Sequence, residues 1–87
     1  MDHFHEEFHA SKGDLVEFRL SGQANVKLMD DINYAAYRRG RNYRFHGGLA
    51  KASPTTLPIP HTGHWHAVVD LGGYRGRLGA SITLIRR

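Results

Sequence analysis

Hydrophobic and polar residues alternate over most of the chain, which is typical of β-strands that bury one face. Between residues 3 and 9, Phe4 and Phe8 fall on one face, and three histidines and a glutamate fall on the other. Further short runs of this kind follow, separated by turns that contain glycine, proline or serine. We predict strands over residues 3–9, 15–20, 25–29, 42–46, 53–60, 64–71 and 80–85. The predicted core residues are Val16, Phe18, Leu20, Val26, Leu28, Trp65, Ala67, Val69 and Leu71.

The alternation stops between residues 30 and 40, where the spacing of apolar residues indicates one short helix. An aspartate caps its start, and two acidic residues stand at the positive end of the helix dipole. Gly40 is the predicted stop. The predicted apolar stripe consists of Ile32, Ala35 and Ala36. Because a helix of roughly two turns is not stable alone in water, we expect it to lean on the sheet.

The prolines of the 53–60 run place that strand at a sheet edge. Pro58 and Pro60 are two residues apart, so their missing N–H groups lie on the same side of an extended chain. Six or seven short strands with one inserted helix predict an all-β fold. Its form is a small antiparallel β-sandwich or a jelly-roll-like barrel. No repeat or long linker divides the chain, so residues 1–87 are predicted to form a single domain.

Composition narrows the class of protein. The 87 residues contain no cysteine, which excludes disulfides, zinc–thiolate sites and thiol nucleophiles. A secreted domain of this size often needs disulfides, and the N-terminus lacks the features of a signal peptide, so we expect a cytoplasmic protein. No segment is long enough to span a membrane. The net charge of +4 permits anionic partners, and seven histidines are unusually many for this length.

A series of short motifs occurs in an order that resembles one bacterial family. They are Gly13-Asp14, Met29-Asp30-Asp31, Tyr37-Arg38-Arg39-Gly40, Phe45-His46-Gly47-Gly48, Thr62-Gly63-His64-Trp65 and Asp70-Leu71-Gly72-Gly73. That family is known only as a domain of unknown function, found as short stand-alone proteins and sometimes beside TIR domains. The resemblance covers nearly the whole chain. It implies a β-sandwich-like module with a sensing or recruiting role, and it implies no catalytic residue.

Two His-x-His pairs, His3/His5 and His64/His66, are candidate metal ligands. Alternate residues of a strand share a face and lie about 6.5–7 Å apart, so both rings can converge on one ion. Asp70 shares the face of His66. One hypothesis is therefore a divalent transition metal site formed by His64, His66 and Asp70. The two pairs could also share an ion if their strands are adjacent. The alternative is that these are solvated polar side chains and that the protein has no cofactor.

Arginine and tyrosine residues crowd the segment 37–44. Arginine binds phosphates in a bidentate manner, and tyrosine rings can stack on nucleobases. We therefore predict a basic face that binds an anionic ligand, a nucleic acid or a protein partner. Its candidate residues are Tyr37, Arg38, Arg39, Arg41, Tyr43, Arg44, Arg75 and Arg77. The alternative is a solvated helix end followed by a strand with outward-facing arginines.

No pattern in the sequence indicates catalysis. No serine lies in a Gly-x-Ser-x-Gly elbow, and the acidic pairs are adjacent in sequence. The sequence favours a small binding or sensing module that is not an enzyme and that acts through the basic face. The other reading is a metal-binding β-sandwich that uses a His-x-His strand, with metal-dependent catalysis as an extension. The sequence leaves the oligomeric state open.

Overall fold

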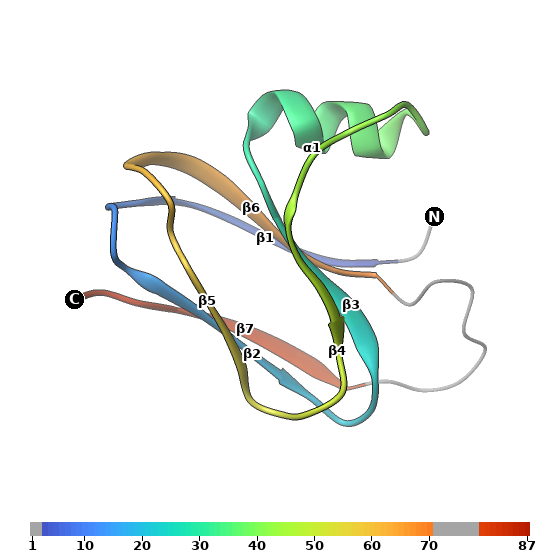
Figure 1. The fold of residues 1–87 in the computed structure, drawn as a ribbon, viewed down its shortest axis with the longest axis vertical. Coiled ribbons are helices and arrows are strands. Elements are labelled where there is room, and N and C mark those ends of the chain that lie inside the picture. The colour runs from blue at the N-terminus through green and yellow to red at the C-terminus, as the bar shows by residue number, and fades with distance from the viewer. Residues whose placement is uncertain (1–2, 71–78) are drawn as a thin grey trace.

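A computed structural model describes residues 3–70 and 79–87 of the chain. In this part of the chain, seven strands form two antiparallel sheets (Figure 1). The elements are β1 (His3–Ala10), β2 (Leu15–Leu20), β3 (Ala24–Met29), α1 (Asp31–Arg38), β4 (His46–Ala50), β5 (Thr55–Pro58), β6 (Gly63–Asp70) and β7 (Ala80–Ile85). One sheet has the order β1-β6-β3-β4 and the other the order β5-β2-β7. The prediction of an all-β sandwich is confirmed.

The hydrophobic core lies between the two sheets, where alternate residues of each strand point inward. The largest buried side chains include Phe18 of β2, Leu28 of β3 and Trp65 of β6. Val16, Val26, Ala67 and Val69, which were also predicted to be core residues, are buried there as well. Leu20 is partly buried against this cluster. Leu71 lies outside the described residues.

The strand that carries Pro58 lies at a sheet edge, as the two prolines predicted. β5 is an edge strand of the three-stranded sheet and pairs with β2, with Pro58 opposite Leu15. Pro60 lies beyond the end of β5. An edge position accepts a missing N–H because one side of the strand needs no partner. The prediction of an edge strand here is confirmed, over a shorter range than 53–60.

The strand predicted over residues 42–46 is misplaced, because β4 begins at His46 and ends at Ala50. Residues 41–45 have no regular structure, and the Arg44 N–H donates to Asn33 Oδ1 at 2.7 Å instead of to a neighbouring strand. The two glycines after His46, expected to close the strand, lie inside β4. Gly47 has a φ of 128°, and a Cβ there would collide with the backbone of Val26 on β3. The glycine therefore lets β4 approach β3 closely.

Helix α1 lies on the outer face of the four-stranded sheet, on the side away from the second sheet (Figure 1). It packs on β3 and β6. The predicted cap is confirmed, since the Asp30 carboxylate accepts the Asn33 N–H at 2.9 Å. The predicted stop is also confirmed, since Gly40 follows the helix with a φ of 71°. α1 has eight residues, and no helix in the described ranges is long and apolar enough to cross a membrane.

The predicted apolar stripe of α1 is wrong. Ile32 is 81% exposed, and Ala35 is exposed as well. The helix instead buries Tyr34 and Tyr37, which lie three residues apart on one face. The sheet surface beneath α1 carries histidine, lysine and aspartate side chains. A tyrosine suits this surface because it adds a hydroxyl that can hydrogen-bond to it.

Candidate metal centre

Strands β1 and β6 are neighbours, and histidines from both ends of the chain meet on their outer face. The antiparallel register aligns Glu7 with His66 and His9 with His64. His5 also reaches His66, and His5 Nε2 lies 2.8 Å from His66 Nδ1. The two His-x-His pairs are thus on adjacent strands, which is the arrangement that a shared ion requires.

Two acidic side chains join these histidines, one from β1 and one from the start of α1. We name the five residues the histidine cluster: His5, Glu7, Asp31, His64 and His66. Two sets within it could hold a metal ion, namely His5–Glu7–His66 and Asp31–His64–His66. In each set the three ligand atoms lie within 4.8 Å of one another. His66 belongs to both sets because its two ring nitrogens face opposite ways.

Asp31 determines which nitrogens carry hydrogen. Hydrogen bonds from His66 and His64 hold the pKa of Asp31 below its ordinary value, so it is a carboxylate at neutral pH. Its Oδ1 lies 2.6 Å from both His66 Nε2 and His64 Nδ1. Because a carboxylate only accepts, both nitrogens must donate to it. In the neutral form of each ring, His66 Nδ1 and His64 Nε2 then carry the lone pairs, and that of His66 Nδ1 accepts the Nε2–H of His5 at 2.8 Å.

The ring of Tyr34 holds two of the imidazoles in place. It stacks on His5 and on His66, with ring centroids 4.2 and 4.3 Å apart. The two imidazole planes differ by only 12°. Their facing nitrogens therefore point toward one another in nearly one plane. The Tyr34 hydroxyl lies 3.2 Å from His3 Nε2, which places His3 at the border of the cluster.

The cluster is buried at His66 and open at both carboxylates, since the side chain of Asp31 at the start of α1 is 64% exposed. The side chain of His66 is 8% exposed, whereas that of Glu7 is 55% exposed. Glu7 Oε2 lies 3.7 Å from His66 Nδ1 and 3.8 Å from His5 Nε2. Burial, followed by repulsion from His66, lowers the pKa of His5. The His5 ring is therefore neutral at neutral pH, and its Nε2 can bind an ion once the ring proton moves to Nδ1.

Asp70, predicted as the third ligand beside His64 and His66, has other contacts. Its Oδ2 accepts the Tyr37 hydroxyl at 2.8 Å and lies 3.3 Å from Lys27 Nζ. Burial alone would lower the pKa of Lys27. Its hydrogen bonds with Tyr43 and Asp70 outweigh this and raise it, so the ammonium stays charged. Asp70 is the counterion of this buried lysine and belongs to neither ligand set. Glu7 and Asp31 provide the carboxylates instead.

The arginines of the predicted basic face are exposed, but its tyrosines are not open to solvent. The exposed residues are Arg38, Arg39, Arg41 and Arg44. Tyr37 is 2% exposed, and Tyr43 is half-buried with its hydroxyl 2.6 Å from Lys27 Nζ. The Tyr37 ring is therefore not free to stack on a ligand. Arg75 and Arg77 lie outside the described residues.

Fold and site together define a small all-β sandwich whose outer face carries a histidine cluster that could hold a metal ion. The chain belongs to the family described as Domain of unknown function (DUF1883), whose model matches residues 1–87. Comparison with curated proteins and with solved structures finds no match. The resemblance seen in the sequence is confirmed as membership of a family of unknown function. Bacterial origin and the association with TIR domains stay predictions.

Proposed function

We propose that the protein binds one divalent transition metal ion through His5, Glu7 and His66. The observation that carries the proposal is the distance between their ligand atoms. In a tetrahedral site with metal–ligand bonds of 2.0–2.1 Å, neighbouring ligand atoms are about 3.3 Å apart. The three separations are 2.8, 3.7 and 3.8 Å, on either side of that value. Small movements of the side chains would therefore complete the site.

The ligand types favour zinc or a similar ion over magnesium and calcium. Two imidazole nitrogens and one carboxylate suit zinc, iron, nickel or copper, whereas magnesium and calcium prefer oxygen ligands throughout. Asp31 would hold the distal nitrogen of His66, a contact that orients metal-binding histidines in many proteins. Three protein ligands leave a fourth position, open on the exposed side at Glu7. A metal-dependent sensor or enzyme needs such a position for water or a small ligand.

The test is a calorimetric titration of tag-free, chelator-treated protein with Zn²⁺, together with elemental analysis. We expect one Zn²⁺ per chain. His66→Ala and Glu7→Gln should each weaken the affinity by more than about 100-fold, and Asp31→Asn by about 10- to 100-fold. His46→Ala is the matched control, because His46 is exposed on β4 and lies outside both ligand sets.

Two results would contradict this assignment. A Zn²⁺ affinity that His66→Ala leaves unchanged would exclude the cluster as the site. If Glu7→Gln bound normally while Asp31→Asn and His64→Ala did not bind, the ion would lie in the other ligand set.

A second candidate function is the binding of an anionic partner by the exposed arginines. Four arginines lie within residues 38–44, and none of them forms an ion pair with a residue in the described part of the chain. Unneutralised guanidinium groups at such density attract phosphates and carboxylates. The partner would be a polyanion such as single-stranded nucleic acid, or a protein with an acidic surface.

Salt dependence tests the second candidate. Binding of a labelled single-stranded oligonucleotide, followed by fluorescence anisotropy, should weaken with salt. The slope of log affinity against log salt should be about −2 to −3 for three or four phosphate contacts. The double variant Arg38→Gln/Arg41→Gln should flatten the slope, and Lys51→Gln, at an exposed lysine outside the segment, should leave it unchanged. Binding that is absent at low salt, or indifferent to salt, would contradict the proposal.

A further inference from the structure

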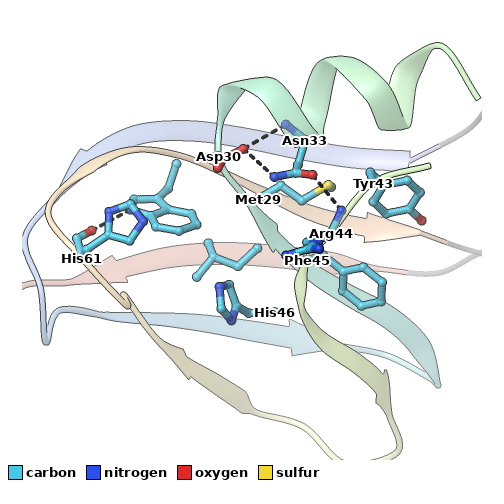
Figure 2. Close-up of a pocket in the computed structure, with 10 residues that line it drawn as sticks. Met29, Asp30, Asn33, Tyr43, Arg44, Phe45, His46 and His61 are labelled. Carbon is cyan, nitrogen blue, oxygen red and sulfur yellow. Dashed lines mark hydrogen bonds between the residues drawn. The ribbon is translucent and has the colours of Figure 1, made fainter. Parts of the chain in front are cut away.

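A pocket of about 680 Å³ lies beside the start of α1, separate from the histidine cluster. Figure 2 shows His61 on one side of it and Tyr43, Arg44 and Phe45 on the other. None of the five cluster residues lines it. Its volume falls within the range of small-molecule sites in proteins, about 300–1,000 Å³.

The pocket follows from the way in which two strands part. β3 and β4 pair up to Leu28 and His46, where β4 begins. The chain before His46 leaves the sheet and runs toward α1, so no strand covers the end of β3 on this side (Figure 2). Met29, Leu28 and the buried Trp65 line the resulting space. The pocket thus follows from the backbone path of residues 41–45.

Ring side chains surround this space. His61 and Trp65 have ring centroids 4.8 Å apart, and His46 lies 6.0 Å from Trp65. Phe45 is 41% exposed, and both histidines are exposed as well. Exposed rings that line one pocket offer stacking surfaces for a planar ligand, and such stacking tolerates any base because every base has a π-face.

Two charged groups in the pocket define the rest of the ligand. Arg44 has an exposed side chain without an ion pair among the described residues, and its backbone is fixed by the hydrogen bond to Asn33. Asn33 is in turn held by the Asp30 Oδ1 that caps α1 (Figure 2). An exposed arginine at the edge of a pocket suits a phosphate. Asp30 Oδ2, which accepts no hydrogen bond from a described residue, suits an amino group on a ring.

We infer that this pocket binds a nucleoside monophosphate, with the base between the ring side chains and the phosphate on Arg44. The exocyclic amino group of the base would donate to Asp30. This site shares Arg44 with the second candidate function, but it depends neither on that function nor on the metal centre.

Trp65 is the sole tryptophan of the chain and lines the pocket, so its fluorescence reports binding. The probe is AMP, with adenosine and inorganic phosphate as its separate halves. We expect a saturable change with AMP, and affinities at least about tenfold weaker for either half, because each lacks one set of contacts. Amide and indole NMR shifts at Phe45, His46 and Trp65 provide a second readout of the same titration.

Matched variants separate this site from the other two proposals. Arg44→Gln should weaken AMP binding by at least about tenfold. Arg39→Gln should leave it unchanged, because Arg39 is exposed and lines a different hollow at the end of α1. His66→Ala should abolish Zn²⁺ binding and leave AMP binding intact. The inference is overturned if neither the fluorescence nor the NMR shifts saturate with AMP, or if inorganic phosphate binds as tightly as AMP does. It is also overturned if Arg44→Gln and Arg39→Gln weaken AMP binding by the same factor.

Discussion

Gly47 lies where the backbone leaves no room for a side chain. It lies inside β4 with a φ of 128°, and an added Cβ would meet the backbone of Val26. We predict that Gly47→Ala destabilises the protein by at least about 2 kcal/mol in urea unfolding, because it combines an unfavourable φ with a backbone collision. Gly63→Ala is the control, since its Cβ would find only His61 Nδ1 at 3.9 Å. Equal stability of the two variants would contradict the close approach of β4 to β3.

Asp14 links the turn after β1 to the end of the described chain. We predict that its carboxylate makes the stability of the protein depend on pH. Its carboxylate accepts the backbone N–H groups of Ser11 and Arg87 at 2.9 and 3.0 Å. These hydrogen bonds lower the pKa of Asp14 below its ordinary 3.8. A lowered pKa in the folded state means that the contribution to stability is complete above pH 3.8 and is lost as the pH falls further.

The measurement is urea unfolding of the wild type and Asp14→Asn between pH 7 and pH 2. The wild type should be the more stable protein at neutral pH. Its advantage should shrink below pH 3.8, as the carboxyl is protonated. A difference that stays constant over the whole range would show that the charge of Asp14 has no part in these hydrogen bonds.

At the scale of elements, α1 is held by its tyrosines, and its most apolar residue faces solvent. We predict that Tyr34→Ala costs about 2–4 kcal/mol in the free energy of unfolding, because a buried ring stacked on His5 and His66 is removed. Ile32→Ala should change it by less than about 0.5 kcal/mol, since Ile32 is 81% exposed. The reverse order of effects would mean that the helix packs through the stripe predicted from apolar spacing.

The sequence predicted most elements and erred where two signals conflicted. Period-two alternation located five strands closely, because each of them buries one face in the core. The prolines located the edge strand β5, over too long a range. β4 was missed because Gly47 and its neighbour resemble a turn, whereas here glycine permits close contact between strands. The helix was found through its cap and stop. The buried face of the helix was not predicted, because a rule based on apolar residues overlooks tyrosines that hydrogen-bond to polar side chains of the sheet.

For the molecule as a whole, the histidine cluster joins elements that are distant in sequence. His5, Asp31 and His66 come from β1, α1 and β6. An ion bound there would stabilise only the folded chain. At 100 times its dissociation constant the gain is about 2.7 kcal/mol. For a domain of this size we predict a rise in Tm of about 10–20 °C with Zn²⁺, measured by calorimetry.

Two histidine variants provide the controls, one inside the cluster and one outside it. His66→Ala should show no rise in Tm with Zn²⁺, and His46→Ala should show the full rise. A rise of equal size in both variants would indicate metal binding elsewhere on the protein.

The candidate site was predictable only in part. The two His-x-His pairs were visible in the sequence, and Glu7 stood on the face of His5 at a spacing of two. The role of Asp31 was hidden, because an acidic residue at a helix start already has a local explanation in the dipole. The pairing of β1 with β6 determines which carboxylate lies beside His66. It aligns Glu7 with His66 and leaves Asp70 at the last residue of β6. Strand pairing over such a distance leaves no local pattern in the sequence.

The pairing of β1 with β6 also has a consequence for the protein during its synthesis. The described β1 pairs with β6 alone, and β6 ends at Asp70. During translation β1 is made before β6 and must therefore wait, unpaired, while some sixty further residues are made, which takes roughly 3–12 s at ordinary rates. Throughout that time it displays a free edge with Phe4 and Phe8. The side chains between them include Glu6 and Glu7, and charged residues on an unpaired strand oppose its pairing with another chain.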